Sequence, residues 1–273
     1  PLHDLRPARE TCEQCHWPTR FVGDKLDIRK HYDEDEANTE LTTALLLRVG
    51  GLAGQRSHGI HWHVDPDVKI RYRSDETRED IYEVELTNGD GTVTTWADRG
   101  APEEGGVWRE MDCVDCHNRP SHIYQSAHVE VDRLINEGLV DRSLPFIKKE
   151  GLRVIDAQYE SHEAARAGIT DGLRAYYAEN YPEIAKEKAQ AIDAAAEALG
   201  DAYAVNVFPG MNVWWDTYPN HIGHEQSDGC ARCHKRSMRT EDREQIDDDC
   251  EVCHVVLAEE EENPDFIAVL NPE

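Results

Sequence analysis

The chain contains four copies of a Cys-x-x-Cys-His motif, and together they use every cysteine of the protein. The eight cysteines are Cys12, Cys15, Cys113, Cys116, Cys230, Cys233, Cys250 and Cys253, and the histidines that follow them are His16, His117, His234 and His254. This spacing is typical of covalent haem attachment, in which two thiols add to the porphyrin vinyl groups and the histidine coordinates the iron. We therefore predict four haem c groups, with no cysteine left for a disulfide or a nucleophile.

Two other kinds of site also use paired cysteines. Zinc ribbons close four ligands around one ion, and thioredoxin-type motifs carry a single redox-active pair within alternating strands and helices. Neither requires a histidine directly after each pair, whereas all four pairs have one here. The pattern therefore favours haem over zinc or dithiol chemistry.

Composition indicates a thin protein core and an acidic surface. Of the 273 residues, 39% are hydrophobic and 7% aromatic, so we expect the haem macrocycles to supply much of the core. The formal net charge of -27 disfavours nucleic acid and anionic membranes as partners and would attract cationic ones. Solubility alone also explains such a charge, and this is the interpretation we favour.

The sequence shows neither an apolar run long enough to span a bilayer, about 18 residues, nor a signal peptide. Haem c is attached outside the cytoplasm. We therefore expect a periplasmic or extracellular protein from which an export signal has been removed.

We expect an α+β fold in one tetrahaem domain over residues 1–273, with little regular structure around the motifs. Its segments are a first haem segment at 1–40, a small antiparallel β insertion at about 41–99, a second haem segment at 100–124, a helical support at about 125–205, and a third and fourth haem segment at 206–273. Alternating apolar residues predict strands at 42–49, 60–64, 68–73, 81–86 and 92–96, with a hairpin turn at 88–91. Helices are predicted at 129–139, 145–158, 162–177 and 182–199, and the acidic run 257–262 is expected to be loose.

Glycine and proline add detail to the helical segment. Pro145 suits the first turn of the second helix, because a first-turn residue needs no backbone N–H donor. Gly200 is the expected stop of the fourth helix. His128 and His162 lie in this segment, and we expect both to be surface residues and not ligands.

Each iron with two histidine ligands needs one histidine beyond its motif. His61 and His63 are two residues apart on a predicted strand, so they would share a face about 7 Å apart and serve two neighbouring haems. A surface histidine cluster or a zinc site, with His58 included, is the alternative. His224 is preferred to His221, because the adjacent Gly223 lets the backbone approach a porphyrin.

The short chain between His117 and His122 limits which iron His122 can coordinate. Only five residues separate it from His117, which is too few to pass around the porphyrin edge to the other face of the same iron. We expect His122 to cross to an adjacent haem. The third and fourth motifs begin only twenty residues apart, so their haems should form a close pair.

Several blocks of sequence resemble the multihaem c cytochromes of the NapC/NirT type. These blocks are 5–17, 58–63, 111–122, 218–224 and 229–234. By this resemblance His3, His58, His61, His63, His122 and His224 match recurring histidines of the family and are distal ligand candidates. Members typically begin with a membrane helix and a haem segment that accepts electrons from quinol; this chain has neither, so it resembles the portion downstream of that module.

The favoured function is electron transfer by haem-to-haem hopping, with other redox proteins or extracellular electron acceptors as partners. Six distal candidates exceed four irons, so a surplus histidine such as His3 could ligate a neighbour's haem in a conductive homopolymer, an extracellular filament. The alternative is a reductase of nitrite, hydroxylamine or a related oxyanion with one open iron. Four uniform motifs and the surplus of histidines favour the relay.

Overall fold

The fold is described from a computed structural model, in which residues 8–16, 23–50, 59–119, 122–224 and 227–266 are described. Chain contacts divide the protein into two compact units. The motif unit takes Pro1–Asp27, Leu45–Ile123 and Pro219–Val256, and the helical unit takes Ile28–Ala44, Tyr124–Tyr218 and Leu257–Glu273. All four Cys-x-x-Cys-His motifs belong to the motif unit. The expectation of a single domain stays a prediction, while the α+β class is confirmed.

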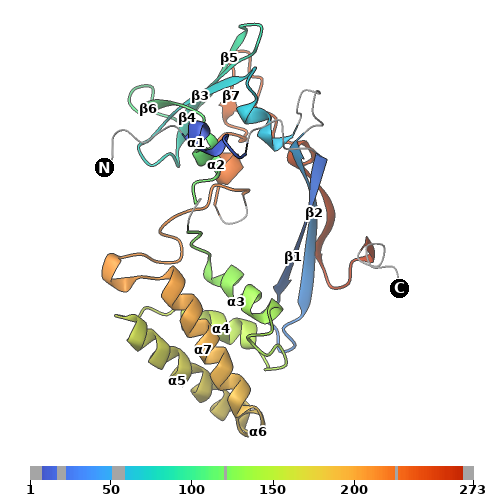
Figure 1. The fold of residues 1–273 in the computed structure, drawn as a ribbon, viewed down its shortest axis with the longest axis vertical. Helices are drawn as coiled ribbons and strands as arrows, with labels where there is room; N and C mark the ends of the chain where they lie inside the picture. Colours follow the sequence, from blue (N-terminus) through green and yellow to red (C-terminus); the bar gives the residue numbers. More distant parts are fainter. Residues whose placement is uncertain (1–7, 17–22, 51–58, 120–121, 225–226, 267–273) are drawn as a thin grey trace. The chain divides into compact units, whose positions relative to one another are not determined.

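The helical unit is built mainly from five α-helices (Figure 1). They are α3 (Ala127–Asn136), α4 (Ile147–Ile155), α5 (His162–Asn180), α6 (Pro182–Glu187) and α7 (Ala189–Asn206), followed by the 3₁₀ turn η3 (Pro209–Met211). Ser126 and Ser161 cap α3 and α5 by accepting hydrogen bonds from Val129 N and Ala164 N. None of the helices in the described ranges is long and apolar enough to cross a membrane.

This unit has a hydrophobic core of its own, which corrects the expectation that protein side chains alone would form only a thin core. Its largest fully buried side chains are Tyr177, Tyr203, Leu134, Leu144, Ile147, Ile155, Ile169, Leu173 and Leu199. They come from α3, α4, α5 and α7 and the segments between them, so the four helices share one interior. The interior of this unit is therefore formed by protein side chains.

Two predictions about helix ends are wrong. The predicted helix 182–199 is two helices divided at Lys188, and α7 runs past Gly200 to Asn206. Gly200 is buried against α5, where an added Cβ would lie 3.2 Å from Arg166 Cγ. The glycine therefore serves close helix packing and not helix termination. The helix after Pro145 begins at Ile147, with Phe146 as its N-cap residue.

A buried ion pair fixes α4 against α3. Lys148 Nζ lies 2.6 Å from Asp132 Oδ1 and donates to the His128 carbonyl at 2.9 Å, and the Lys148 side chain is only 3% exposed. Burial lowers the pKa of Lys148 and raises the pKa of Asp132, and at each residue the opposite charge of the partner counteracts this. Each ion thus depends on the other for its charged form.

The motif unit contains a five-stranded antiparallel sheet in the order β6-β3-β4-β5-β7 (Figure 1). Its strands are β3 (Lys69–Ser74), β4 (Ile81–Thr87), β5 (Val93–Asp98), β6 (Val107–Glu110) and β7 (Met238–Arg239). The predicted turn at 88–91 joins β4 to β5, and Asn88 N donates to Thr92 O at 2.9 Å. One small cluster of Ile70, Tyr72, Ile81, Val84 and Met238 is buried here. The thin core expected from composition is confined to this unit.

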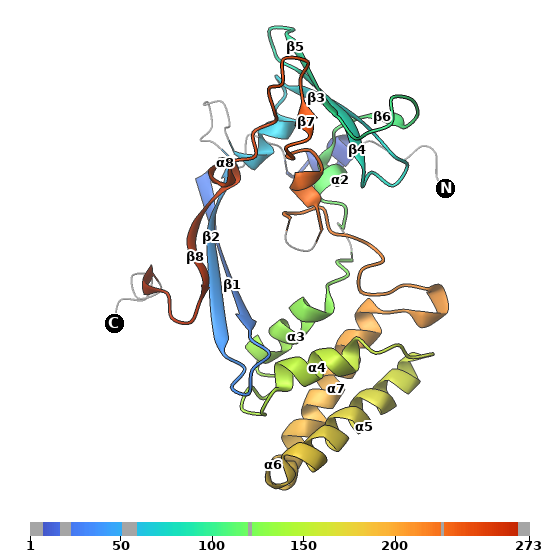
Figure 2. The same ribbon diagram turned by 180° about the vertical axis from the view of Figure 1, so that it is seen from behind.

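A second sheet has the order β1-β2-β8 and corrects two expectations. Its strands are β1 (Gly23–Tyr32), β2 (Glu40–Gly50) and β8 (His254–Glu261), drawn together in Figure 2. The first strand of the expected insertion, β2, pairs here and not with β3. The acidic run that we expected to be loose forms most of β8, because Ala258 is buried, with 3% of its surface exposed, while the glutamates stay in solvent. Each of the three strands gives residues to both units.

We expect Lys148→Met to destabilise the helical unit by about 3–5 kcal/mol, because it leaves the Asp132 carboxylate buried without its cation. Guanidinium unfolding of the full-length protein, followed by circular dichroism at a helix wavelength, measures the change. Lys149→Met is the matched control, since Lys149 is the neighbouring residue and its side chain is exposed. Equal losses for the two variants would contradict the prediction.

Candidate haem-binding site

Each Cys-x-x-Cys-His motif folds as one tight helical turn. The turns are the end of α1 (Ala8–Cys12) with the residues after it, α2 (Cys113–Cys116), the 3₁₀ turn η4 (Gly229–Arg232) and α8 (Cys250–Cys253). In each, the backbone N–H of the histidine donates to the carbonyl of the first cysteine; the distances are 2.8 Å for His16, 2.8 Å for His117 and 3.0 Å for His234, and His254 N bonds Cys250 O. The same closure brings both thiols and the histidine of a motif together in all four copies.

Motifs that follow one another in the chain lie near each other. Helix α1 packs beside α2. The third motif contacts the second, because Arg232 Nη2 donates to Asp115 O at 2.7 Å. Burial raises the pKa of Cys253, and the nearby Cys230 adds to the shift, so the third and fourth motifs are neighbours. This last contact is the one expected from their short separation along the chain.

Three of the motif histidines face a histidine from elsewhere in the motif unit. The ring centroids of His61 and His117 are 6.3 Å apart with the planes within 8° of parallel. The centroids of His63 and His234 are 5.8 Å apart at 73°, and those of His224 and His254 are 6.1 Å apart at 31°. Each pair joins one motif histidine to one of the distal candidates taken from the sequence.

These separations fit a metal ion between the rings. A bond from a metal ion to a histidine nitrogen is about 2 Å long, and the ring centroid lies about 1 Å beyond that nitrogen. Two histidines on opposite sides of one iron therefore have centroids about 6 Å apart, as the three pairs have. Among the described residues, no group of three or more His, Cys, Asp or Glu side chains is arranged to hold an ion by itself.

Hydrogen bonds at Nδ1 orient three of these rings. Nδ1 of His61 lies 2.8 Å from Val49 O, Nδ1 of His63 lies 2.7 Å from Ile60 O, and Nδ1 of His234 lies 2.6 Å from Asp247 O. A carbonyl only accepts, so Nδ1 carries the hydrogen and Nε2 keeps its lone pair for a metal. Burial lowers the pKa of His63 and of His117, and neighbouring histidines add to this, which also favours the neutral ring.

The prediction that residues 60–64 form a strand is wrong, because they form the 3₁₀ helix η2 (Ile60–Val64). In a strand His61 and His63 would share one face, whereas three residues per turn send side chains two apart in different directions. His61 accordingly meets His117 of the second motif and His63 meets His234 of the third. Gly59 precedes the turn, where an added Cβ would lie 2.4 Å from Arg48 O.

Eight histidines lie outside these pairs. One of them, His31 in β1, has its Nε2 3.9 Å from Glu260 Oε1. Both ring nitrogens of the buried His221 face oxygen atoms, Asp115 O at 3.2 Å and Glu79 Oε1 at 2.8 Å, so neither is directed at an iron. His128 is exposed, and His162 Nε2 bonds Val207 O at 2.6 Å in the helical unit. For His16, no histidine ring among the described residues lies opposite, and His122 forms none of the three pairs. His3 and His58 lie outside the described residues.

Sequence reasoning missed a buried polar network between the second and third motifs. The carboxylate of Asp115 accepts from Tyr72 Oη at 2.5 Å and from Asp112 N at 2.7 Å, and it pairs with Arg78 at 3.0 Å. Arg232 donates to the carbonyl of Asp115 at 2.7 Å. Both residues stand directly before the second cysteine of their motif, and their opposite charges were the available signal.

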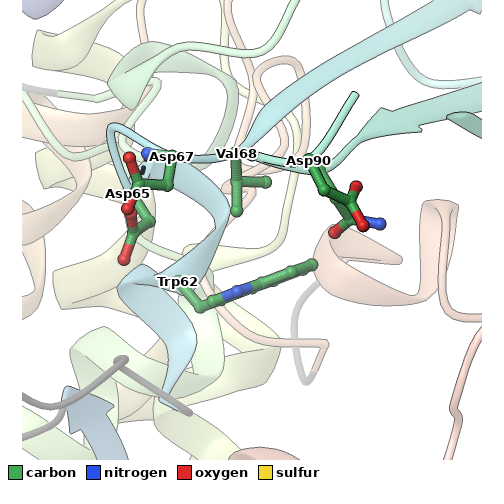
Figure 3. Close-up of a pocket in the computed structure, with 7 residues that line it drawn as sticks. Trp62, Asp65, Asp67, Val68 and Asp90 are labelled. Atoms are coloured by element: carbon green, nitrogen blue, oxygen red, sulfur yellow. Dashed lines mark hydrogen bonds between the residues drawn. The ribbon is translucent and has the colours of Figure 1, made fainter. Parts of the chain in front are cut away.

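A separate pocket of about 470 Å³ lies beside η2 and has an acidic lining. Figure 3 shows Trp62 beneath Val68, with Asp65 and Asp67 on one side and Asp90 on the other; Asn88 and Gly89 complete the lining. The Trp62 indole stands edge-on to His63, with centroids 5.7 Å apart. The pocket holds no motif residue and no member of the histidine pairs, so it is not a haem site.

Comparison with known proteins gives one informative relative. The chain is 42% identical over 269 residues to the cytochrome c-type protein ImcH of Geobacter sulfurreducens, an alignment that covers 96% of this chain and 53% of the relative. The chain therefore spans about half the length of the curated relative it matches. No family model matches the chain. No solved structure matches it either.

We expect Gly229→Ala to disturb the third motif. Gly229 has φ +38° and an added Cβ would lie 1.7 Å from Gly223 O, the atom that accepts from Cys230 N. Intact mass spectrometry of the purified variant should show about one haem fewer per chain than the parent. Gly210→Ala is the control, because nothing lies within 4 Å of its Cβ position. Unchanged haem content in Gly229→Ala would show that the turn tolerates the side chain.

Proposed function

We propose that this chain is a c-type cytochrome with covalently bound haem c, and that it relays electrons along a row of four haems outside the cytoplasm. The observation that supports this most directly is the set of three histidine pairs, each of which joins a motif histidine to a histidine from elsewhere. Haem supplies reversible one-electron exchange at its iron. The protein's part is to hold four such groups close together and to fill both axial positions.

In this proposal the eight motif cysteines bind the porphyrins, and His16, His117, His234 and His254 are the proximal ligands. The distal ligands are His61 for the second motif, His63 for the third and His224 for the fourth. The carbonyl bonds at Nδ1 hold the rings of His61, His63 and His234 in place, so that little rearrangement accompanies a change of iron charge. His122, His58 and His3 remain the candidates for the first motif.

Partners and location follow from the same reasoning. We propose that the protein exchanges electrons with other redox proteins or extracellular acceptors, and that its net charge of -27 selects cationic docking faces. We also propose that His3 completes the haem of a neighbouring copy in a homopolymer. Light scattering over a range of protein concentrations tests the polymer, and a monodisperse monomer throughout would exclude it.

One observation favours a second function. His16 has no opposite histidine ring among the described residues, so the first motif is where an open iron would lie. An open position is what a reductase of nitrite, hydroxylamine or a related oxyanion requires. Electron paramagnetic resonance separates the two functions, because an iron with two histidine ligands is low-spin and an iron with one is high-spin.

We predict that the oxidised protein shows only low-spin haem, and that His61→Ala converts about one haem in four to high-spin by removing the ring opposite His117. His128→Ala should leave the spectrum unchanged, because His128 is exposed on α3. The measurement is the spin-state spectrum with haem quantified on the same sample. A high-spin fraction in the parent protein would favour the reductase, and an unchanged spectrum in His61→Ala would refute the assignment of His61.

A further inference from the structure

The second and third motifs carry opposite charges at the same place. Asp115 and Arg232 each stand directly before the second cysteine, where the first motif has Gln14 and the fourth has Val252. Arg232 is thus the only cation at this place in the four motifs. Its side chain is turned inward, and Arg232 is 9% exposed.

Three carbonyl oxygens from three parts of the motif unit hold the guanidinium of Arg232. Nε donates to Gly229 O at 2.9 Å within its own turn, and Nη2 donates to Asp115 O at 2.7 Å in the second motif. Nη1 donates to Arg78 O at 2.6 Å in the loop between β3 and β4. One side chain thereby ties the third motif to the second and both to the sheet.

The charge of Arg232 has no anionic partner in the part of the chain that the structure describes. The carboxylate of Asp115 is engaged elsewhere, with Tyr72, Arg78 and the backbone of Asp112. Carbonyl dipoles solvate the guanidinium without cancelling its charge. A buried cation of this kind is weakly screened by solvent, so it acts on whatever lies beside it.

Arg232 lies close to the attachment cysteines of both motifs. It directly precedes Cys233 in the chain, and its Nη2 bonds the carbonyl of Asp115, the residue that directly precedes Cys116. The positive charge is therefore close to the attachment points of the second and third haems together.

We propose that Arg232 is a positioning residue that holds the second and third haem turns together and makes the reduction potentials of their haems more positive. The inference rests on the proposed function. Reduction transfers one electron from a reduced donor protein to the iron and lowers the charge of the haem by one, with no bond made or broken. A nearby fixed positive charge stabilises the reduced form of a haem. The second and third haems are therefore reduced before haems that have no such charge beside them.

Arg232→Gln and Arg236→Gln make a matched test. The two arginines stand two residues before and two residues after His234, but the Arg236 side chain is 88% exposed and lies 3.6 Å from Asp248 Oδ2. Both substitutions remove one charge. The measurement is a potentiometric titration of the haem-loaded full-length protein, followed by haem absorbance.

The comparison is made at the potential where the haems with the more positive reduction potentials are half reduced in the parent protein. At this potential we expect the ratio of reduced to oxidised haem to be at least tenfold lower in Arg232→Gln than in the parent. A tenfold change equals about 59 mV for a one-electron couple. Arg236→Gln should change the ratio by less than about twofold, because solvent screens an exposed charge. A curve for Arg232→Gln that overlies the parent or the control, at full haem content, would overturn the proposal.

Arg232→Lys separates charge from position. Lysine keeps the charge but lacks the planar fork that reaches three carbonyls, so the potentials should stay within about twofold of the parent ratio. A shift as large as in Arg232→Gln would show that geometry alone matters and overturn the electrostatic role. If Arg232→Gln takes up no haem, Arg232→Met, which also removes the charge, is titrated in its place against the same tenfold criterion. The proposed function fails separately, if the parent holds no covalent haem or shows no reversible reduction.

Discussion

In the proposed relay, an iron with two histidine ligands needs one ring on each side, and this requirement would account for the arrangement of the motif unit. Each Cys-x-x-Cys-His turn supplies one ring with its own short hydrogen bond, so the second ring has to come from another segment. Helix η2 supplies two of them, and the segment before the third motif supplies His224. Strand β3 contacts η2, Gly223 O accepts from Cys230 N, and Arg232 bonds Asp115 O, so these contacts join the segments to the motifs.

The interiors of the two units are built from different kinds of contact. The helical unit buries aliphatic and aromatic side chains from α3, α4, α5 and α7 in one interior. In the motif unit, five described hydrophobic residues are buried at the sheet, and polar contacts such as those of Asp115 lie beside the motifs. A thin core is what a chain can tolerate when large apolar macrocycles occupy the interior. The low hydrophobic content of the whole sequence therefore reflects the motif unit more than the helical one.

The sequence was informative where the chemistry is local. A Cys-x-x-Cys-His motif is complete within five residues, and strands β3, β4 and β5 follow from alternation and one turn, so these could be predicted. Helix η2 was mistaken for a strand, because alternation at 60–64 fits both, and the choice depends on packing around Gly59. The continuation of α7 past Gly200 and the pairing of β2 with β1 and β8 are set by tertiary contacts that no local pattern records. For the same reason Arg232 was overlooked, since two of its three partners, Arg78 and Asp115, are distant in sequence.

The ends of the long helical insertion lie next to each other. Tyr124 and Tyr218 bound the 95 residues between the second and third motifs that belong to the helical unit, and their rings are 5.4 Å apart. In an unfolded chain, closing a loop of this length carries an entropic penalty. Once the helical unit has folded on its own core, the loop is already closed, and the two flanking segments leave from adjacent points. The helical unit holds no Cys-x-x-Cys-His motif, but its folding reduces the entropic penalty of bringing the second and third motifs together.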